Sequence, residues 1–160
     1  MAVQSKDIKI EGTQAVWDLR MEGPIKGTYS GTFRFRCFLT PIQSIAAGRE
    51  YRELLGANMA LAMEHESALA WALCQLKYRV ISAPPFWGSE NPEGGISGNL
   101  SDELVITEVL NAAIASENKY MEQIKKRKEE AIIRAKRASE AILEQKEEKK
   151  ESKEKAEDET

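Results

Sequence analysis

The chain has little of what most catalytic sites are built from. It holds one histidine and two cysteines. His65 and Cys74 fall in a segment of helical pattern, and their spacing puts them on opposite helix faces, so they form no nucleophile–base pair. The two Glu residues beside His65 have no further partner at metal-ligand spacing. We therefore expect no enzyme, no catalytic residue, no metal and no cofactor. Cys37 and Cys74 stand alone and are expected to be buried thiols in a reducing compartment.

The sequence also lacks an excess of positive charge and any long apolar run. Its formal net charge is −3, so it has no surplus of cations to neutralise phosphates, and we expect no nucleic-acid partner. No stretch approaches the roughly 18 apolar residues of a membrane span. The first residues have no apolar core of the signal-peptide kind. These absences favour a cytoplasmic protein without a membrane partner.

Proline, glycine, tryptophan and phenylalanine are absent from residues 117–160, which hold 13 basic and 13 acidic residues. Such a segment cannot bury a core of its own, but it can form a solvated helix with ion pairs between successive turns, or a disordered chain of mixed charge. Only Ala156 is apolar beyond Leu143, so we expect disorder towards the end. The sequence therefore predicts an apolar body over residues 1–116 and a charged helical segment over residues 117–160.

The first third of the chain has the two-residue period of β-strands. Thr, Ser and Arg alternate, between residues 28 and 38, with residues that share the other face: Tyr29, Gly31, Phe33, Phe35 and Cys37. Residues 15–21 alternate in the same way, and residues 22–27 are short enough to join the two strands. Aromatic residues opposite polar ones are typical of an antiparallel strand with one buried face. We predict a β-hairpin over about residues 15–38.

Helical signals begin at Thr40, which is followed by Pro41 and by Gln43 in the pattern of a capping box. The first predicted helix covers residues 41–55, with Ile42, Ile45, Ala46 and Leu55 inward and with Arg49, Glu50, Arg52 and Glu53 in solvent. The second covers about residues 63–81 as the central helix, with these residues mostly buried: Trp71, Leu73, Leu76 and Val80. The third covers residues 101–116 and continues into the charged segment; its inward residues are Val105, Ile106, Val109, Leu110, Ala113 and Ile114. The predicted fold class is α+β, mainly α, with the hairpin packed on a small helical body.

Two other motifs have ordinary explanations. The Gly-rich residues 94–98 precede a helix, as phosphate-binding loops do, but Asn99 stands where a P-loop has lysine, so we expect a flexible loop. The basic run at residues 125–128 is flanked by glutamates, which is typical of a solvated helix face.

The best binding candidates are large apolar residues expected near the surface. Phe86 and Trp87 follow the break made by Pro84 and Pro85, where aromatics either fill a partner's groove or cap the protein's own core. Tyr120, Met121 and Ile124 begin a thin apolar stripe in the charged segment. We predict that these five residues form a partner-binding surface.

Four stretches carry a resemblance to a known family, and they occur in a characteristic order. They are GTFRFRCFLTP (31–41), REYRELLG (49–56), ALAWALCQLKYRVISAPPFW (68–87) and SDELVITEVLNAAI (101–114). This order of an aromatic and basic strand, a Thr-Pro helix start, an Arg-rich helix, an apolar helix and a Pro-aromatic corner resembles the phage tail assembly chaperones. The resemblance covers a little over half of the chain, and residues 1–28 and the charged segment lie outside it.

The resemblance implies a binding function. Such a chaperone would shield apolar helical segments of the tape-measure protein in the host cytoplasm until tail-tube proteins polymerise around it, and it would be absent from the mature virion. It could also form a homo-oligomer. The alternative is a structural head or tail component that docks through its long C-terminal helix and stays in the particle.

Overall fold

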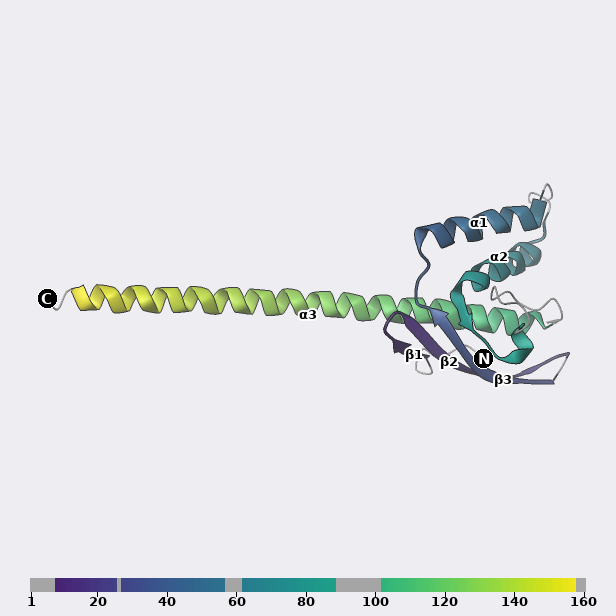
Figure 1. Ribbon diagram of the computed structural model, residues 1–160, viewed down its shortest axis with the longest axis horizontal. Helices are drawn as coiled ribbons and strands as arrows, with labels where there is room; N and C mark the ends of the chain where they lie inside the picture. Colours follow the sequence, from purple (N-terminus) through teal and green to yellow (C-terminus); the bar gives the residue numbers. More distant parts are fainter. Residues whose placement is uncertain (1–7, 26, 57–61, 89–101, 158–160) are drawn as a thin grey trace. The chain divides into compact units, whose positions relative to one another are not determined.

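The computed structural model describes residues 8–25, 27–56, 62–88 and 102–157, with side chains as far as Ile142; the Gly-rich residues 94–98 lie outside it. The chain consists of two units, Met1–Tyr120 and Met121–Thr160. The elements are β1 (Ile8–Glu11), β2 (Gln14–Gly23), β3 (Gly27–Arg36), α1 (Pro41–Leu55), α2 (Glu64–Arg79), β4 (Val80–Ser82), the 3-10 turn η3 (Pro85–Trp87) and α3 (Glu103–Glu157) (Figure 1). The fold is α+β and mainly α, as predicted.

The described strands form one antiparallel sheet in the order β1-β2-β3-β4. The predicted hairpin is confirmed as β2 and β3, which pair from Gln14↔Arg36 to Gly23↔Gly27. The edge strands β1 and β4 were not predicted. They have four and three residues, too few to show a period, and their pairing depends on the hairpin that they join.

The apolar face of the hairpin is the floor of the core. Trp17 pairs with Phe33 and Ala15 with Phe35 across β2 and β3, and all four are buried. The Phe33 and Phe35 rings stack with centroids 5.8 Å apart. The predicted face is therefore confirmed, since its large residues point inward and the intervening Thr32 and Arg34 are exposed.

The first turns of α3 lie along this aromatic face (Figure 1). Val105, Val109 and Ala112 are fully buried, and they belong to the same core cluster as Phe33 and Leu76. Most of the predicted inward residues of this helix are confirmed. Ile114 is the exception, because it is 43% exposed and lies on the side away from the sheet.

Helix α1 has the predicted bounds and the predicted start. The Thr40 hydroxyl accepts a hydrogen bond from the Gln43 amide, and the Gln43 side chain accepts one from the Thr40 amide. The predicted burial of Ile42 and Ile45 is wrong, because they are 80% and 63% exposed. The buried residue is Ala47, on the side that packs against α2. The side of α1 that carries Ile42 and Ile45 therefore faces solvent.

Helix α2 is the central helix, and Leu76 and Val80 are buried as predicted. It ends at Arg79 rather than at Ile81, because Val80 pairs with Phe35 in the sheet. Leu73 is half-buried. The predicted burial of Trp71 is wrong, because this side chain is 44% exposed and packs the edge of its ring against Tyr51 of α1.

In the second unit, α3 continues as helix to Glu157; fraying or disorder towards the end of the chain stays a prediction. Ala, Glu, Lys, Gln and Arg have high helix propensity, and this part of the chain contains little else. Among the described residues, no helix is both long and apolar enough to cross a membrane.

Asp102 joins the hairpin to the start of α3. Its carboxylate is 1% exposed and accepts a hydrogen bond from the Tyr29 hydroxyl at 2.5 Å and another from the Ile25 amide at 3.2 Å. A buried carboxylate is stable only when such donors replace its water. The bond to Asp102 raises the pKa of Tyr29 to about 12.

Because Leu76 lies at the centre of the core, shortening its side chain should cause a large loss of stability. Leu76→Ala should lower the free energy of unfolding by about 2–5 kcal/mol, because the lost contacts leave a cavity. The matched control is Trp71→Ala on the same helix, which should lower it by less because Trp71 is partly exposed. Urea denaturation measures both, and a larger loss for Trp71→Ala would contradict this packing.

The Tyr29–Asp102 bond predicts a specific alkaline dependence. The raised pKa means that the folded state holds the Tyr29 proton more tightly than the unfolded state. The resulting stabilisation is present below pH 10 and is lost as the pH rises from 10.0 to about 12. Tyr29→Phe should therefore lower the unfolding free energy by about 1–3 kcal/mol at neutral pH, and its deficit should shrink above pH 10. Tyr51→Phe is the control, and an equal alkaline dependence in both variants would refute the assignment.

Candidate functional site

The predicted aromatic pair of the partner surface belongs to the core. Trp87 is 2% exposed, and its ring meets Phe33 edge-on with centroids 5.1 Å apart. Phe86 is half-buried, with its ring edge against Tyr29 at 5.1 Å. Of the two alternatives, the pair therefore caps its own core, because η3 turns both rings towards the sheet. Changing Trp87 to Ala would test stability rather than binding.

The other three predicted residues fall in both units. Tyr120 ends the first unit, is half-buried and stacks on Phe38 with ring centroids 5.8 Å apart. Met121 and Ile124 begin the second unit; Met121 is 55% exposed and Ile124 is half-buried. Of the five predicted residues, Met121 is the one with an exposed side chain.

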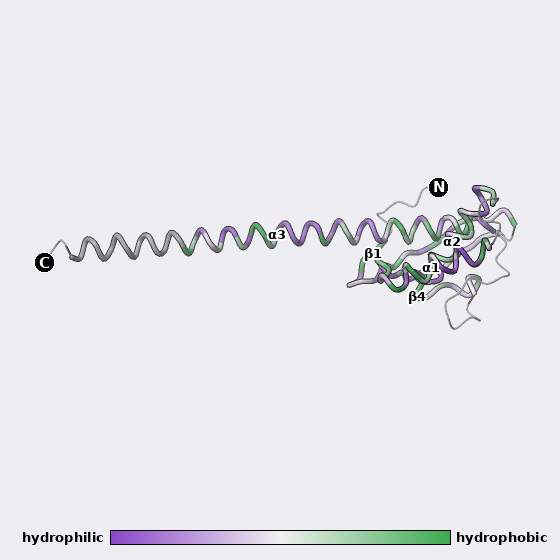
Figure 2. Tube along the Cα trace, turned by 90° about the horizontal axis from the view of Figure 1, so that it is seen from above, coloured by the Kyte–Doolittle hydropathy of each residue, from purple (hydrophilic) through white to green (hydrophobic). Residues whose placement is uncertain are grey.

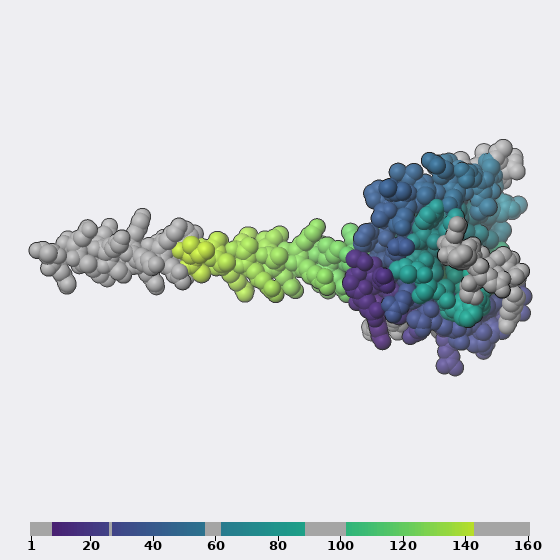
Figure 3. Space-filling view, in the orientation of Figure 1, coloured from purple at the N-terminus to yellow at the C-terminus, as the bar shows by residue number. Residues whose placement is uncertain are grey.

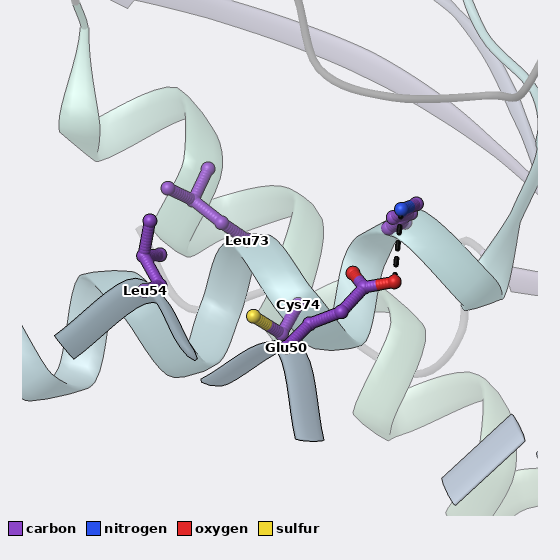
Figure 4. Close-up of a pocket in the computed structure, with 5 residues that line it drawn as sticks. Glu50, Leu54, Leu73 and Cys74 are labelled. Atoms are coloured by element: carbon purple, nitrogen blue, oxygen red, sulfur yellow. Dashed lines mark hydrogen bonds and ion pairs between the residues drawn. The ribbon is translucent and has the colours of Figure 1, made fainter. Parts of the chain in front are cut away.

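A different site lies between α1 and α2, which pack side by side (Figure 1). The contact is held by Glu50 of α1, whose Oε1 accepts hydrogen bonds from the Tyr78 hydroxyl at 2.6 Å and from Lys77 Nζ at 2.9 Å. The second of these is also an ion pair and is drawn as a dashed line in Figure 4. This network fixes how the two helices meet, because one carboxylate oxygen receives two donors from successive residues of α2.

Next to this network the helices leave a cavity of about 270 Å³. It is lined by Glu50, Leu54, Leu73, Cys74 and Lys77 (Figure 4). Leu54 and Leu73 come from facing helices and form an apolar end, while Glu50 and Lys77 form a charged end. A hollow of this kind can hold one or two apolar side chains of a partner with a charged rim beside them.

Electrostatics distinguish the groups around the cavity. The hydrogen bond from Tyr78 and the contacts with Lys77 hold the pKa of Glu50 below its ordinary value, and the same bond to Glu50 raises the pKa of Tyr78. Burial raises the pKa of the Cys74 thiol, and burial also raises the pKa of Cys37 to about 11. A thiol is a weak nucleophile when its pKa is raised, so these cysteines act as small apolar residues.

The solvent-facing side of α1 adds an exposed apolar surface. Ile42 and Ile45 are one turn apart, so they lie on the same side of the helix, and α1 lies along the upper edge of the first unit in the view of Figure 3 (blue). Leu54 at the other end of α1 is also exposed. We call the side of α1 that carries Ile42 and Ile45 the α1–α2 surface; Leu54 and the cavity lie around the helix from it, with Leu54 about 180° from Ile45. Large apolar side chains gathered on one helix are typical of a contact site.

The residues considered for chemistry lie apart from this surface. His65 is exposed, with Nε2 3.8 Å from the Glu103 carboxylate. Within the described ranges, no group of three or more His, Cys, Asp and Glu residues is placed to hold a metal ion.

Sequence reasoning missed the α1–α2 surface because it assigned Glu50 to solvent and the two isoleucines to the core. One signal could have corrected this. Ala47 is the small residue that α1 buries, and small residues permit a close approach of two helices. It marks the packed side of α1 better than the larger isoleucines do.

Comparison with known proteins adds no relative. No family model, curated protein or solved structure matches this chain significantly.

The lowered pKa of Glu50 predicts an acid dependence of stability. A carboxylate whose pKa is lower in the folded state stabilises it above the unfolded pKa, which is near 4.5 for Glu, and this contribution is lost as the pH falls through the folded pKa. Glu50→Gln should therefore reduce the unfolding free energy near neutral pH, and its deficit should narrow on acidification. The measurement is a series of urea transitions from about pH 7 to 3. Glu53→Gln on the exposed side of α1 is the control. It should change neither the unfolding free energy near neutral pH nor the dependence of that free energy on pH.

Proposed function

We propose that this chain is a non-enzymatic binding protein that holds an apolar helical segment of a partner on the α1–α2 surface. The observation that carries the proposal is the exposure of Ile42 and Ile45, at 80% and 63%, on a well-capped helix. Apolar side chains of this size favour burial, at about 25 cal/mol per Å² of covered surface. A rigid helix that presents them loses little entropy on binding.

A helical partner fits this surface for a geometric reason. Ile42 and Ile45 form a ridge of one helical turn, and a second amphipathic helix can pack its own ridge beside it. The ion pair of Glu50 with Lys77 is partly exposed, so it contributes specificity rather than much affinity. Such binding is reversible, as a chaperone requires.

The resemblance of residues 31–114 to phage tail assembly chaperones gives this partner a class. On that basis the client is the tape-measure protein of a long-tailed phage, shielded in the host cytoplasm until tail-tube proteins assemble around it. The protein would then leave the tail before the virion matures.

The length of α3 favours a second candidate, a structural component of the virion. Its 55 residues are far more than a small domain needs to close its core, and long helices commonly dock on other subunits. The two functions differ in stoichiometry. A chaperone is absent from purified particles, and a structural component is retained in fixed number.

Co-expression with the tape-measure protein tests the chaperone proposal. The unmodified chain should capture its client in a pull-down. The double change Ile42→Asp and Ile45→Asp should reduce capture about tenfold or more, because it places charges in an apolar contact. Both side chains are exposed, so circular dichroism and the melting temperature should stay unchanged.

The control is Leu104→Asp, which puts the same charge at an exposed leucine on α3 and should leave capture intact. If the control lost capture to the same extent, the α1–α2 surface would not be the site that binds the client. Failure of the unmodified chain to capture the tape-measure protein, together with its retention in purified particles, would favour the structural component.

A further inference from the structure

The second unit carries its own apolar stripe, which continues the residues predicted at Met121 and Ile124. Seven positions recur at alternating spacings of three and four residues, six of them apolar and one a lysine: Met121, Ile124, Lys128, Ala131, Ala135, Ala138 and Ile142. This is the spacing of one side of a helix that packs along another helix. Met121 and Ile142, at its two ends, are each 55% exposed. Figure 2 shows apolar positions in green alternating with polar ones in purple along this part of α3.

The charges of residues 121–142 are distributed unequally around the helix. This stretch has seven basic and four acidic residues. At 100° per residue, the half that carries the stripe contains four of the cations: Lys125, Arg127, Lys128 and Arg134. All four acidic residues lie on the other half: Glu122, Glu129, Glu130 and Glu140. Within residues 121–142 the apolar stripe is therefore bordered by positive charge alone.

The size of the stripe residues restricts what can cover them. Ala131, Ala135 and Ala138 offer little apolar area, and Ile132, which is 58% exposed, adds one large side chain beside them. Helices that lie on membranes need a broad face of large apolar side chains. Small residues instead allow two helix axes to approach closely. If a second copy of this chain packed on the stripe, the cations Arg127, Lys128 and Arg134 of one copy would face cations of the other. Like charges that face each other oppose association.

We propose that residues 121–142 form a docking face for an amphipathic helix of another protein, whose apolar stripe is bordered by Asp and Glu. The apolar residues give such a helix a narrow seam, and the bordering cations select its charge and its register. This site is separate from the α1–α2 surface, and its occupant need not be the client of that surface.

Two designed peptides test the proposal with the full-length chain. Each has three heptads with Leu at the seam positions, and the bordering positions are Glu in one peptide and Lys in the other. In fluorescence anisotropy the Glu peptide should bind about tenfold or more tightly than the Lys peptide, and added salt should weaken its binding. Equal binding, or preference for the Lys peptide, would overturn the proposal.

Matched variants locate the binding face. Arg127→Glu with Arg134→Glu reverses two charges beside the stripe, and Lys126→Glu with Arg137→Glu reverses two on the opposite half, so both variants have the same net charge. The first should abolish the preference for the Glu peptide, and the second should retain it. The same loss in both would mean that net charge alone attracts the peptide, which contradicts a docking face.

Two further measurements separate the other occupants. Sedimentation of the free chain should show a monomer; a dimer that Ile124→Glu dissociates would make a second copy the occupant and overturn the proposal. Vesicles containing phosphatidylserine should not bind the chain, and binding to them in preference to the Glu peptide would refute it in favour of a membrane surface.

Discussion

The packing of the first turns of α3 on the aromatic face of the sheet is the contact on which the rest of this structure depends. A hairpin alone leaves Trp17, Phe33 and Phe35 in water, because two strands cannot cover their own apolar face. Val105 and Val109 of α3, which come late in the sequence of the first unit, cover that face together with Leu76 of α2. Closing the core therefore requires residues widely separated in the sequence.

Asp102 makes this closure specific. Apolar contacts alone would allow a helix to slide along the sheet, since burial has no direction. A buried carboxylate that accepts hydrogen bonds from Tyr29 and Ile25 has one satisfactory position. It thereby sets where α3 begins relative to the hairpin.

The limited size of the core explains the surfaces proposed for binding. Phe86 and Trp87 join the aromatic residues of the sheet to complete one small core. Helix α1 stands outside that core and is held to α2 through small residues and the Glu50 network, so its isoleucines stay on the surface. In the second unit the apolar residues are too few for a core and form a stripe. Both proposed functions follow from apolar side chains that the core does not use.

Local patterns determined much of this protein. The capping residues at Thr40 set the start of α1, the two-residue period set the buried face of the hairpin, and the helix-forming composition set the second unit. The tertiary structure alone decided which side of α1 and which part of α2 are covered, and so placed Ile42, Ile45 and Trp71 in solvent and Trp87 in the core. A period states that one side of an element is apolar. Whether that side is buried depends on a neighbour, and the neighbour is brought by contacts between distant residues that no local pattern contains.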